Sequence, residues 1–312
     1  MFGAKSRSVY LRGLALAAAL TFGAAAPAVA DAPTTGSTIY AQALGGKLTI
    51  AGSSALQPLV DQAAKNYQVA NQNVQMTVSA GGSGAGRSGV CQGSLDIGMS
   101  DVPLTDQEKT NLNCGDAVQT AVAIQAFAVA ANLKGPGGLQ ALDREQMQGI
   151  FTGQITNWSQ VGGDDQQVVL VNRLKGSGTR QNMANYLFDG DDTQFAVGAS
   201  EEDNSQTVVN TVSQTPGAVS YLGLAFLNSP QLVTLGIEQP DGSSLMPSKN
   251  TVSTGQWPIG GPGLAITRDR GSELANSFIS YMISPTFESD PIWDSLGFVV
   301  PANPSIGNPT GQ

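Results

Sequence analysis

Short apolar runs alternate with amphipathic segments along most of this chain. Residues 47–52, 74–80 and 95–99 each have the length and the branched side chains of a buried strand. Each run ends in a small, polar, glycine- or serine-bearing loop that opens onto a helix. In an open α/β sheet such loops meet at the carboxyl edge of the strands, where ligands bind. We therefore expect an α/β fold with a ligand site at this edge.

The later part of the chain continues the alternation. The apolar run 119–131 is too hydrophobic for an edge strand, and we expect it to carry the chain into a second lobe. Residues 226–256 lack periodicity and predict surface loops with short strands, and the tail after Pro301 is expected to be mobile. The other expected elements are helices at 143–151, 205–213 and 273–283 and strands at 168–171, 218–222 and 260–267.

The first 30 of the 312 residues have the pattern of a cleaved secretory signal peptide. A basic leader precedes an apolar stretch, and Ala28-Val29-Ala30 forms a small-x-small cleavage signal, while residues 31–46 read as a loose N-terminal segment. Without the leader's three basic residues the mature chain carries a formal charge of (15 − 3) − 24 = −12. Such a surface argues against nucleic acid and anionic membranes as partners.

The numbers of cysteines and histidines limit the kinds of catalytic and metal site that the chain can form. In an exported protein the two cysteines, Cys91 and Cys114, are most simply a disulfide, and two buried free thiols are the alternative. The chain contains no histidine, which excludes Ser-His-Asp and Cys-His catalysis and histidine-ligated zinc. We expect no catalytic residues, no metal and no cofactor.

Residues 173–180, R-L-K-G-S-G-T-R, combine a strand end, a glycine turn and a helix start. The first N–H groups of a helix have no partner within it, and the helix dipole places partial positive charge there. Hydroxyls from Ser177 and Thr179 and the forked cation of Arg173 would add donors for a small anion. The alternative is an ordinary capped helix whose arginines lie in solvent.

Three further loops, at Ser53-Ser54, Gly82–Gly86 and Ser100-Asp101, could be a helix cap, a flexible turn and an Asx turn if each is taken alone. Together with the Arg173 segment they describe one anion pocket that also contains a carboxylate. A fully deprotonated anion would be repelled by Asp101, whereas an oxyanion that still carries a proton can donate to it. This combination favours phosphate over sulfate.

At this point the chain resembles the PstS family, the substrate-binding components of phosphate ABC importers. The matching motifs are G-S-S-A-L-Q-P at 52–58, G-S-G-A-G at 82–86, D-I-G-M-S-D at 96–101, I-F-T-G-Q-I-T-N-W at 150–158, R-L-K-G-S-G-T-R at 173–180 and P-G-A-V-S-Y at 216–221. The resemblance implies a type II periplasmic binding protein with two lobes, each a mixed sheet flanked by helices, and two crossover strands as hinge. Lobe I would comprise residues 47–122 and 258–312, and lobe II residues 123–257.

The resemblance also implies the residues that hold phosphate between the lobes. Hydroxyl groups, backbone N–H groups, a proton acceptor and a cation would come from Ser54, Ala55, Ser83, Asp101, Arg173, Ser177, Gly178 and Thr179. The chain departs from the pattern in two ways. Leu174 and Lys175 stand where some relatives have an acidic residue that steadies the arginine, and the doublet Ser53-Ser54 leaves open which hydroxyl faces the ligand.

The expected function is phosphate binding without covalent chemistry, by a monomer in the periplasm that docks on a membrane permease, with release outside the cell as the alternative location. A second oxyanion-binding role is the nearest alternative function. The G-x-G-x-x-G pattern at 84–89 could instead mark a dinucleotide-binding exported enzyme. A hydrolase is disfavoured because Ala85 interrupts a G-x-S-x-G pattern around Ser83 and no histidine could serve it.

Overall fold

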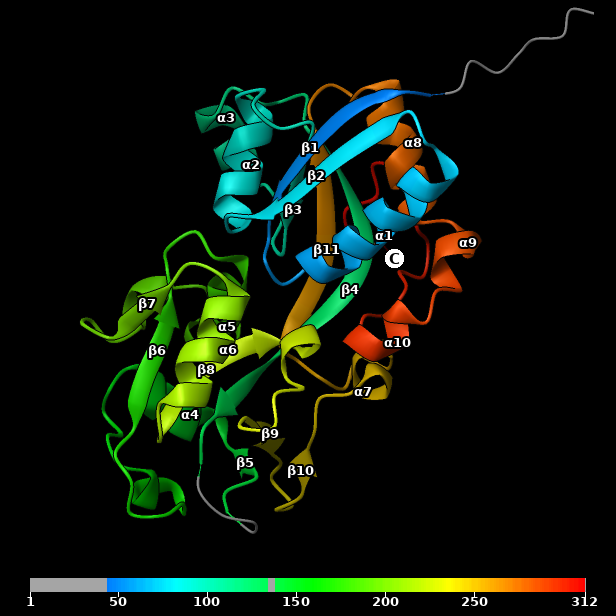
Figure 1. Cartoon of the computed structure of the whole chain (residues 1–312). Coiled ribbons are helices and arrows are strands. Elements are labelled where there is room, and N and C mark those ends of the chain that lie inside the picture. The colour runs from blue at the N-terminus through cyan, green and yellow to red at the C-terminus, as the bar shows by residue number, and fades with distance from the viewer. Residues whose placement is uncertain (1–43, 134–137, 312) are drawn as a thin grey trace, which may run out of the picture. The chain divides into compact units, whose positions relative to one another are not determined.

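The structure is a computed structural model that describes residues 44–133 and 138–311. The expected signal peptide, residues 1–30, and most of the segment 31–46 lie outside the described residues. Figure 1 shows strands and helices interleaved along the chain, which confirms the predicted α/β class. Within the described ranges, no helix has both the length and the apolar character needed to cross a bilayer.

The residues predicted to form lobe I contain a mixed sheet in the strand order β2, β1, β3, β11, β4, of which β4 (Val118–Ala131) continues into the second region. The first three strands are parallel, and β11 is antiparallel to β3 and β4. Leu48 and Ile50 of β1 share a buried apolar cluster with Leu59 and Tyr67 of α1. The elements of this region other than β4 are β1 (Gly46–Gly52), α1 (Gln57–Ala70), β2 (Val74–Ala80), α2 (Ser83–Cys91), β3 (Ile97–Ser100), α3 (Asp106–Asn111), β11 (Gly260–Thr267), α8 (Glu273–Met282), α9 (Pro285–Glu288) and α10 (Ile292–Leu296).

The residues predicted to form lobe II build a second mixed region of the sheet. Here β8 is antiparallel to β4, while β6 is parallel to β8 and β7 is parallel to β6. Phe151, Trp158 and Tyr221 are buried in the core of this region. Its elements are β5 (Ala141–Leu142), α4 (Arg144–Phe151), η1 (Trp158–Val161), β6 (Val169–Arg173), α5 (Gly178–Phe188), η2 (Asp192–Gln194), β7 (Ser200–Glu202), α6 (Ser205–Gln214), β8 (Ala218–Gly223), η3 (Leu224–Phe226), β9 (Val233–Glu238), β10 (Ser244–Leu245) and α7 (Lys249–Ser253).

The long strand β4 (Val118–Ala131) connects the two sheet regions, as the apolar run 119–131 predicts. Val118 to Ala126 pair with β11, and the last residues of β4 pair with β8 on one side and β9 on the other. Figure 1 shows β4 and β11 side by side where the chain passes between the regions. Side chains of β4 belong to buried apolar clusters, Val122 with Leu48 and Phe127 with Trp158, so nearly every residue of the strand is buried.

The tail after Pro301, which the sequence predicts to be mobile, is hydrogen-bonded to the start of β4. The backbone N–H of Ala121 donates to the carbonyl of Asn308 at 2.9 Å, and the N–H of Gly307 donates to the Thr120 hydroxyl at 3.1 Å. Buried backbone donors and acceptors require partners, and the start of β4 finds some of its partners in this tail. The composition of the tail did not reveal these contacts.

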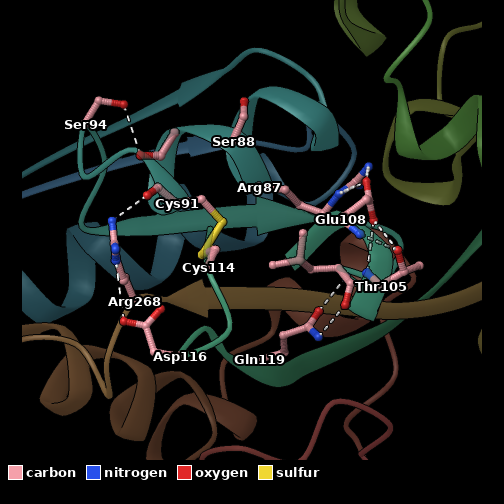
Figure 2. The surroundings of a disulfide bond; sticks show 12 residues. Arg87, Ser88, Cys91, Ser94, Thr105, Glu108, Cys114, Asp116, Gln119 and Arg268 are labelled. Carbon is pink, nitrogen blue, oxygen red and sulfur yellow. Dashed lines mark hydrogen bonds and ion pairs between the residues drawn. A yellow bond between two sulfur atoms is a disulfide. The ribbon is translucent and has the colours of Figure 1, made fainter. Parts of the chain in front are cut away.

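The disulfide Cys91–Cys114 is present, with a Cα–Cα distance of 5.2 Å, which confirms the predicted pairing. Figure 2 shows that it joins the end of α2 to the loop after α3. Both cysteines belong to a buried apolar cluster with Leu104 and Ile266. Since α2 begins at Ser83 and ends at Cys91, the bond anchors the far end of the helix that starts at the glycine-rich loop.

Replacing both cysteines by alanine should lower the free energy of unfolding by about 3 kcal/mol, because the 23-residue separation closes a loop whose entropy is lost from the unfolded chain. Urea denaturation of the double variant measures this difference. Wild-type protein treated with reductant in urea serves as the control and should show the same loss. Equal midpoints for oxidised and cysteine-free protein would contradict the prediction.

Candidate anion-binding site

The loops that follow β1, β2, β3 and β6 meet where the two predicted lobes touch. Parallel strands present their carboxyl ends at one edge, so the loops after β1, β2 and β3 are already neighbours. The loop after β6 reaches them directly, because the N–H of Gly84 donates to the carbonyl of Gly176 at 2.9 Å. A Cβ atom on Gly84 would lie 3.3 Å from that carbonyl oxygen, so the two backbones approach closely because Gly84 carries no side chain.

Asp101 lies at the centre of this contact and is only 2% exposed. Its Oδ1 accepts hydrogen bonds from the hydroxyl of Ser53 and from Nε2 of Gln125, the latter at 2.8 Å. Its Oδ2 accepts a long hydrogen bond of 3.4 Å from the hydroxyl of Thr179. Burial raises the pKa of the Asp101 carboxyl, and the charge of Arg173 and these hydrogen bonds oppose that rise. The buried carboxylate therefore depends on its donors to remain ionised.

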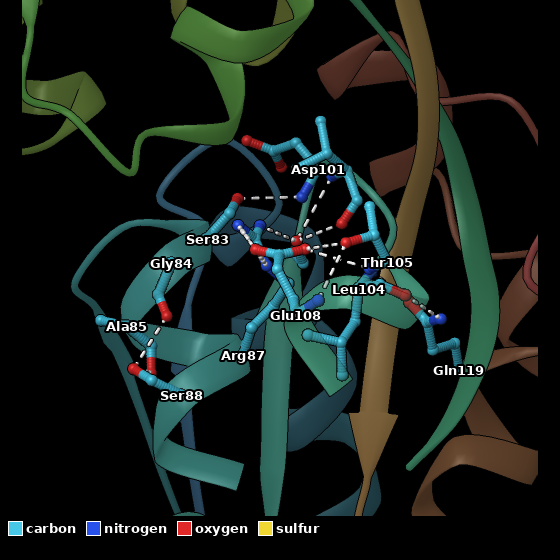
Figure 3. A network of polar contacts seen from close by, with 12 residues as sticks. Ser83, Gly84, Ala85, Arg87, Ser88, Asp101, Leu104, Thr105, Glu108 and Gln119 are labelled. Atoms are coloured by element: carbon cyan, nitrogen blue, oxygen red, sulfur yellow. Dashed lines mark hydrogen bonds and ion pairs between the residues drawn. The ribbon is translucent and has the colours of Figure 1, made fainter. Parts of the chain in front are cut away.

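The backbone of Asp101 is also held on both sides. Its N–H donates to the hydroxyl of Ser83 at 2.9 Å, as Figure 3 shows, and its carbonyl accepts from Nδ2 of Asn182 at 3.0 Å. Ser83 is the first residue of α2, and Asn182 lies on α5. The two helices thus fix Asp101 from opposite lobes.

The two serines of the Ser53-Ser54 doublet have different roles. The Ser53 hydroxyl accepts from the N–H groups of Ala55 and Leu56, each at 3.1 Å, and donates to Asp101. The Ser54 hydroxyl accepts from Nη2 of Arg173 at 3.2 Å. Only Ser54 therefore lies against the arginine, whereas the N–H of Ala55 is occupied by the neighbouring Ser53.

Arg173, at the end of β6, is 1% exposed, so the alternative in which it lies in solvent is wrong. Its Nε donates to the carbonyl of Glu202 at 3.3 Å, and its Nη2 donates to the carbonyl of Asp203 at 3.2 Å. These backbone oxygens replace the acidic residue that the sequence lacks at Leu174 and Lys175. Burial lowers the pKa of Arg173, yet a guanidinium stays charged because its ordinary pKa is above about 12.

One nitrogen of Arg173, Nη1, is buried and has no hydrogen-bond partner among the described residues. An unpaired donor on a buried cation is costly, and native structures rarely keep one without a reason. An anion placed between Arg173 and Asp101 would supply the missing acceptor. The donor set consequently fits a small oxyanion.

The glycine at the start of α5 lets the two lobes approach at this point. A Cβ atom on Gly178 would lie 2.2 Å from Oγ of Ser83 and 2.7 Å from Cβ of Asp101. Ser177 is the N-cap of the helix, and its hydroxyl accepts from the N–H of Arg180 at 3.3 Å. Thr179 is 1% exposed and directs its hydroxyl to Asp101. Every residue predicted for the site therefore lies in or beside the region where the loops of the two lobes meet.

Arg180 is also buried, at 4% exposure, but it serves the structure around the site. Its Nη1 donates to the carbonyl of Arg173 at 2.7 Å and contacts Glu201 at 3.1 Å. Its Nε lies 3.3 Å from Asp192, and the guanidinium packs over the ring of Phe195. The charge of Arg180 is already balanced by these two carboxylates. Its role is therefore to support Arg173 through the hydrogen bond to the Arg173 carbonyl.

Sequence reasoning missed three residues of the site, namely Gln125, Asn182 and Ser205. Ser205 is fully buried as the first residue of α6, and its N–H donates to the Ser54 hydroxyl at 3.0 Å. The sequence contains a recognisable signal for two of these residues, Gln125 and Ser205. Gln125 is the single polar residue in the apolar run 121–131, and Ser205 is a hydroxyl residue at a predicted helix start, like Ser177.

The structure gives the G-x-G-x-x-G pattern at 84–89 a packing role. These residues lie inside α2, so they do not form the turn between strand and helix that dinucleotide binding requires. A Cβ atom on Gly86 would lie 2.4 Å from the carbonyl oxygen of Met99. The glycine therefore allows α2 to pack closely against β3.

Comparison with known proteins assigns the chain to a family. The model of the PBP superfamily domain matches residues 28–286. The phosphate-binding protein PstS of Bacillus subtilis is 35% identical over 249 residues, which are 80% of this chain and 79% of the relative. The chain belongs to the PstS family. PstS of Borreliella burgdorferi is a more distant relative, at 25% identity over 81% of the chain and 89% of its own length.

Solved structures of phosphate-binding proteins share the fold of this PstS-family chain. An ABC-type phosphate transport receptor from Vibrio cholerae is 25% identical, has a TM-score of 0.62, and is matched over 81% of this chain and 100% of its own. A substrate-binding protein with bound phosphate from Clostridium perfringens has a TM-score of 0.72 at 23% identity, covering 82% of this chain and 99% of its own. These likenesses confirm the predicted type II binding-protein fold.

The raised pKa of Asp101 predicts how stability depends on pH. In the folded protein the carboxyl binds its proton more tightly than in the unfolded chain, so the free energy of unfolding falls as pH rises from about 4 through the folded pKa. Asp101→Asn keeps an acceptor for Ser53 and Gln125 but cannot ionise. We expect the ligand-free variant to be more stable than the wild type at pH 7, because only the wild type carries the cost of ionising a buried carboxyl.

Chemical denaturation at pH 4, 5.5 and 7 measures this effect. The control is Asp241→Asn, because Asp241 is exposed and hydrogen bonds from Ser243 lower the pKa of its carboxyl. The control variant should show no gain at pH 7. An Asp101→Asn variant that is less stable than the wild type at pH 7 would contradict the account of the buried carboxylate.

Proposed function

We propose that this protein binds inorganic phosphate between its two lobes and delivers it to the membrane permease of a phosphate ABC importer. The observation that carries the proposal is the pairing of two buried groups: Arg173, whose Nη1 has no acceptor in the described part of the chain, and the acceptor Asp101. Phosphate near neutral pH is an anion that still holds a proton, so it can satisfy both groups at once. The names of the relatives support the same ligand.

The roles of the residues follow from the contacts. Arg173 pairs with the anion through Nη1, and Asp101 accepts the phosphate proton at Oδ2. Hydroxyl and backbone donors come from both sides, namely Ser54 and Ser83 of lobe I and Ser177, Gly178 and Thr179 of lobe II. The N–H of Ala55, expected from the sequence as a further donor, donates to the Ser53 hydroxyl instead. Of the two serines in the doublet, Ser54 is the ligand contact because its hydroxyl already lies against Arg173.

Phosphate binding favours the closed form because each lobe supplies only part of the donor set. Lobe I comprises residues 47–122 and 258–312, lobe II comprises residues 123–257, and β4 and β11 form the hinge. The closed monomer then docks on the permease, and no covalent chemistry or cofactor takes part. Export through the leader 1–30 places the protein in the periplasm, where the disulfide forms.

Titration calorimetry on protein that has been unfolded, dialysed and refolded tests the proposal. We expect one-to-one phosphate binding that an excess of sulfate does not disturb, because sulfate has no proton for Asp101. Arsenate has the charge and protonation of phosphate and should compete. Competition indicates a site for protonated oxyanions in general, and no competition indicates a site specific for phosphate. A native protein that binds no phosphate would contradict the proposed function.

Arg173→Lys should weaken phosphate binding at least about tenfold, because an ammonium cannot replace the forked donors of a guanidinium. The matched control is Arg144→Lys, since Arg144 is half-exposed and paired with Asp189 elsewhere in lobe II. Calorimetry should find wild-type affinity in the control. Equal affinities of the two variants would show that Arg173 does not contact the anion.

Gly178→Ala should weaken phosphate binding by about 5- to 150-fold, which corresponds to a clash of about 1–3 kcal/mol in the closed form. The added Cβ meets Ser83 and Asp101 only while the lobes are in contact. Gly115→Ala is the control, because a Cβ there meets nothing within 4 Å. Wild-type affinity in Gly178→Ala would mean that the lobes do not close at this point.

A further inference from the structure

The two oxygens of the Asp101 carboxylate have unequal surroundings. Oδ1 accepts from Ser53 and from Gln125, whereas Oδ2 accepts only the long 3.4 Å hydrogen bond from Thr179 among the described residues. Oδ2 is also the oxygen nearest the helix start of lobe II, since a Cβ on Gly178 would lie 2.8 Å from it. The less saturated oxygen therefore faces the place where lobe II meets lobe I.

Ser53 can act only as a donor toward Asp101. A hydroxyl has one proton and two acceptor positions, and the N–H groups of Ala55 and Leu56 occupy both acceptor positions. The remaining proton must point to Oδ1 of Asp101. A proton on Oδ1 itself would meet a hydroxyl that has no acceptor position left, so this oxygen is kept unprotonated.

Gln125 adds a second donor to the same oxygen, and its position has a cost. It is 3% exposed within the otherwise apolar run 121–131, and its Oε1 has no hydrogen-bond partner among the described residues. An apolar residue would avoid that unpaired oxygen. In return, Gln125 provides a hydrogen bond from its Nε2 to Asp101, which an apolar residue could not make.

The place of Gln125 in the fold makes this donor independent of lobe closure. It lies on β4 and is paired with Gly261 of β11, so it sits on the two strands that connect the lobes. Ser53 follows β1 in lobe I. Asp101 is thus oriented by Ser53 of its own lobe and by Gln125 of the hinge strand before Thr179 and Gly178 of lobe II arrive.

We propose that Ser53 and Gln125 are specificity-positioning residues: by donating together to Oδ1 of Asp101 they keep the carboxylate an acceptor and reserve Oδ2 for the proton of the bound oxyanion. The inference rests on the proposed phosphate function and names the groups that set its selectivity against sulfate. If the carboxylate were protonated, Asp101 would become a donor and could bind sulfate as well. Selectivity therefore depends on the donors to Oδ1.

Few other groups can influence the ionisation of Asp101. The charged side chain that faces it is Arg173 of β6, and its charge favours the ionised form. The hydrogen bonds to Asp101 in the described structure come from uncharged groups, namely Ser53, Ser83, Gln125, Thr179 and Asn182. Removing one donor while Arg173 stays in place should shift the pH at which Asp101 becomes protonated.

The test compares phosphate and sulfate affinities of wild type, Gln125→Met and Gln125→Glu by calorimetry between about pH 5 and pH 9. Met keeps the length of the side chain but cannot donate, so the selectivity of Gln125→Met should fall at least about tenfold below wild type at pH 5 and return toward it at pH 9. In Gln125→Glu two facing carboxyls share a proton, so the loss should extend to neutral pH. Ser53→Ala should behave like Gln125→Met.

The matched control is Gln119→Met on the same strand. Gln119 is also buried, and its amide is paired with the backbone of Leu104, as Figure 3 shows. This variant loses two hydrogen bonds without touching Asp101, so its stability should fall while its selectivity matches wild type at every pH. Each comparison is made at equal pH, because phosphate itself changes protonation over this range.

A second readout needs no ligand. Carbon-13 NMR of the Asp101 carboxyl should give a higher pKa in Gln125→Met than in wild type and an unchanged value in Gln119→Met. Wild-type selectivity, pH profile and carboxyl pKa in Gln125→Met would overturn the inference and leave the phosphate function intact. Failure of the wild type itself to bind phosphate would overturn both.

Discussion

A carboxylate buried between two lobes is the constraint on which the rest of this structure depends. Asp101 is almost fully covered, and burial alone would drive it to its neutral form. The surrounding groups oppose that tendency in two ways: Ser53, Gln125 and Thr179 supply hydrogen bonds, and Arg173 supplies charge. A site with this composition is poorly suited to a bare anion and well suited to one that brings its own proton.

Much of this arrangement could be predicted from the sequence, because periodicity and glycine placement report local structure directly. Strands 74–80 and 260–267 have the predicted bounds, and the buried run 119–131 is the strand that joins the lobes. The loops after successive parallel strands had to meet at one edge, so the grouping of Ser54, Ser83 and Asp101 followed from strand order. The disulfide followed from the two cysteines of an exported chain.

The remaining features depend on groups that leave little trace in a sequence. Arg173 is oriented by the carbonyls of Glu202 and Asp203, and every residue has a carbonyl, so no side-chain pattern could have shown this. The choice between Ser53 and Ser54 depends on the dihedral angles of a turn. Gln125 stood out as a lone polar residue, but its partner is 24 positions away along the chain and became visible only through the sheet register.

The measurement that tests the central claim most directly is a crystal structure of the protein with phosphate bound. The account predicts one phosphate between the lobes, with one oxygen at hydrogen-bond distance from Nη1 of Arg173 and another from Oδ2 of Asp101, while Oδ1 keeps its contacts to Ser53 and Gln125. Phosphate bound away from Arg173, or an Asp101 carboxylate turned so that Oδ1 faces the ligand, would contradict it.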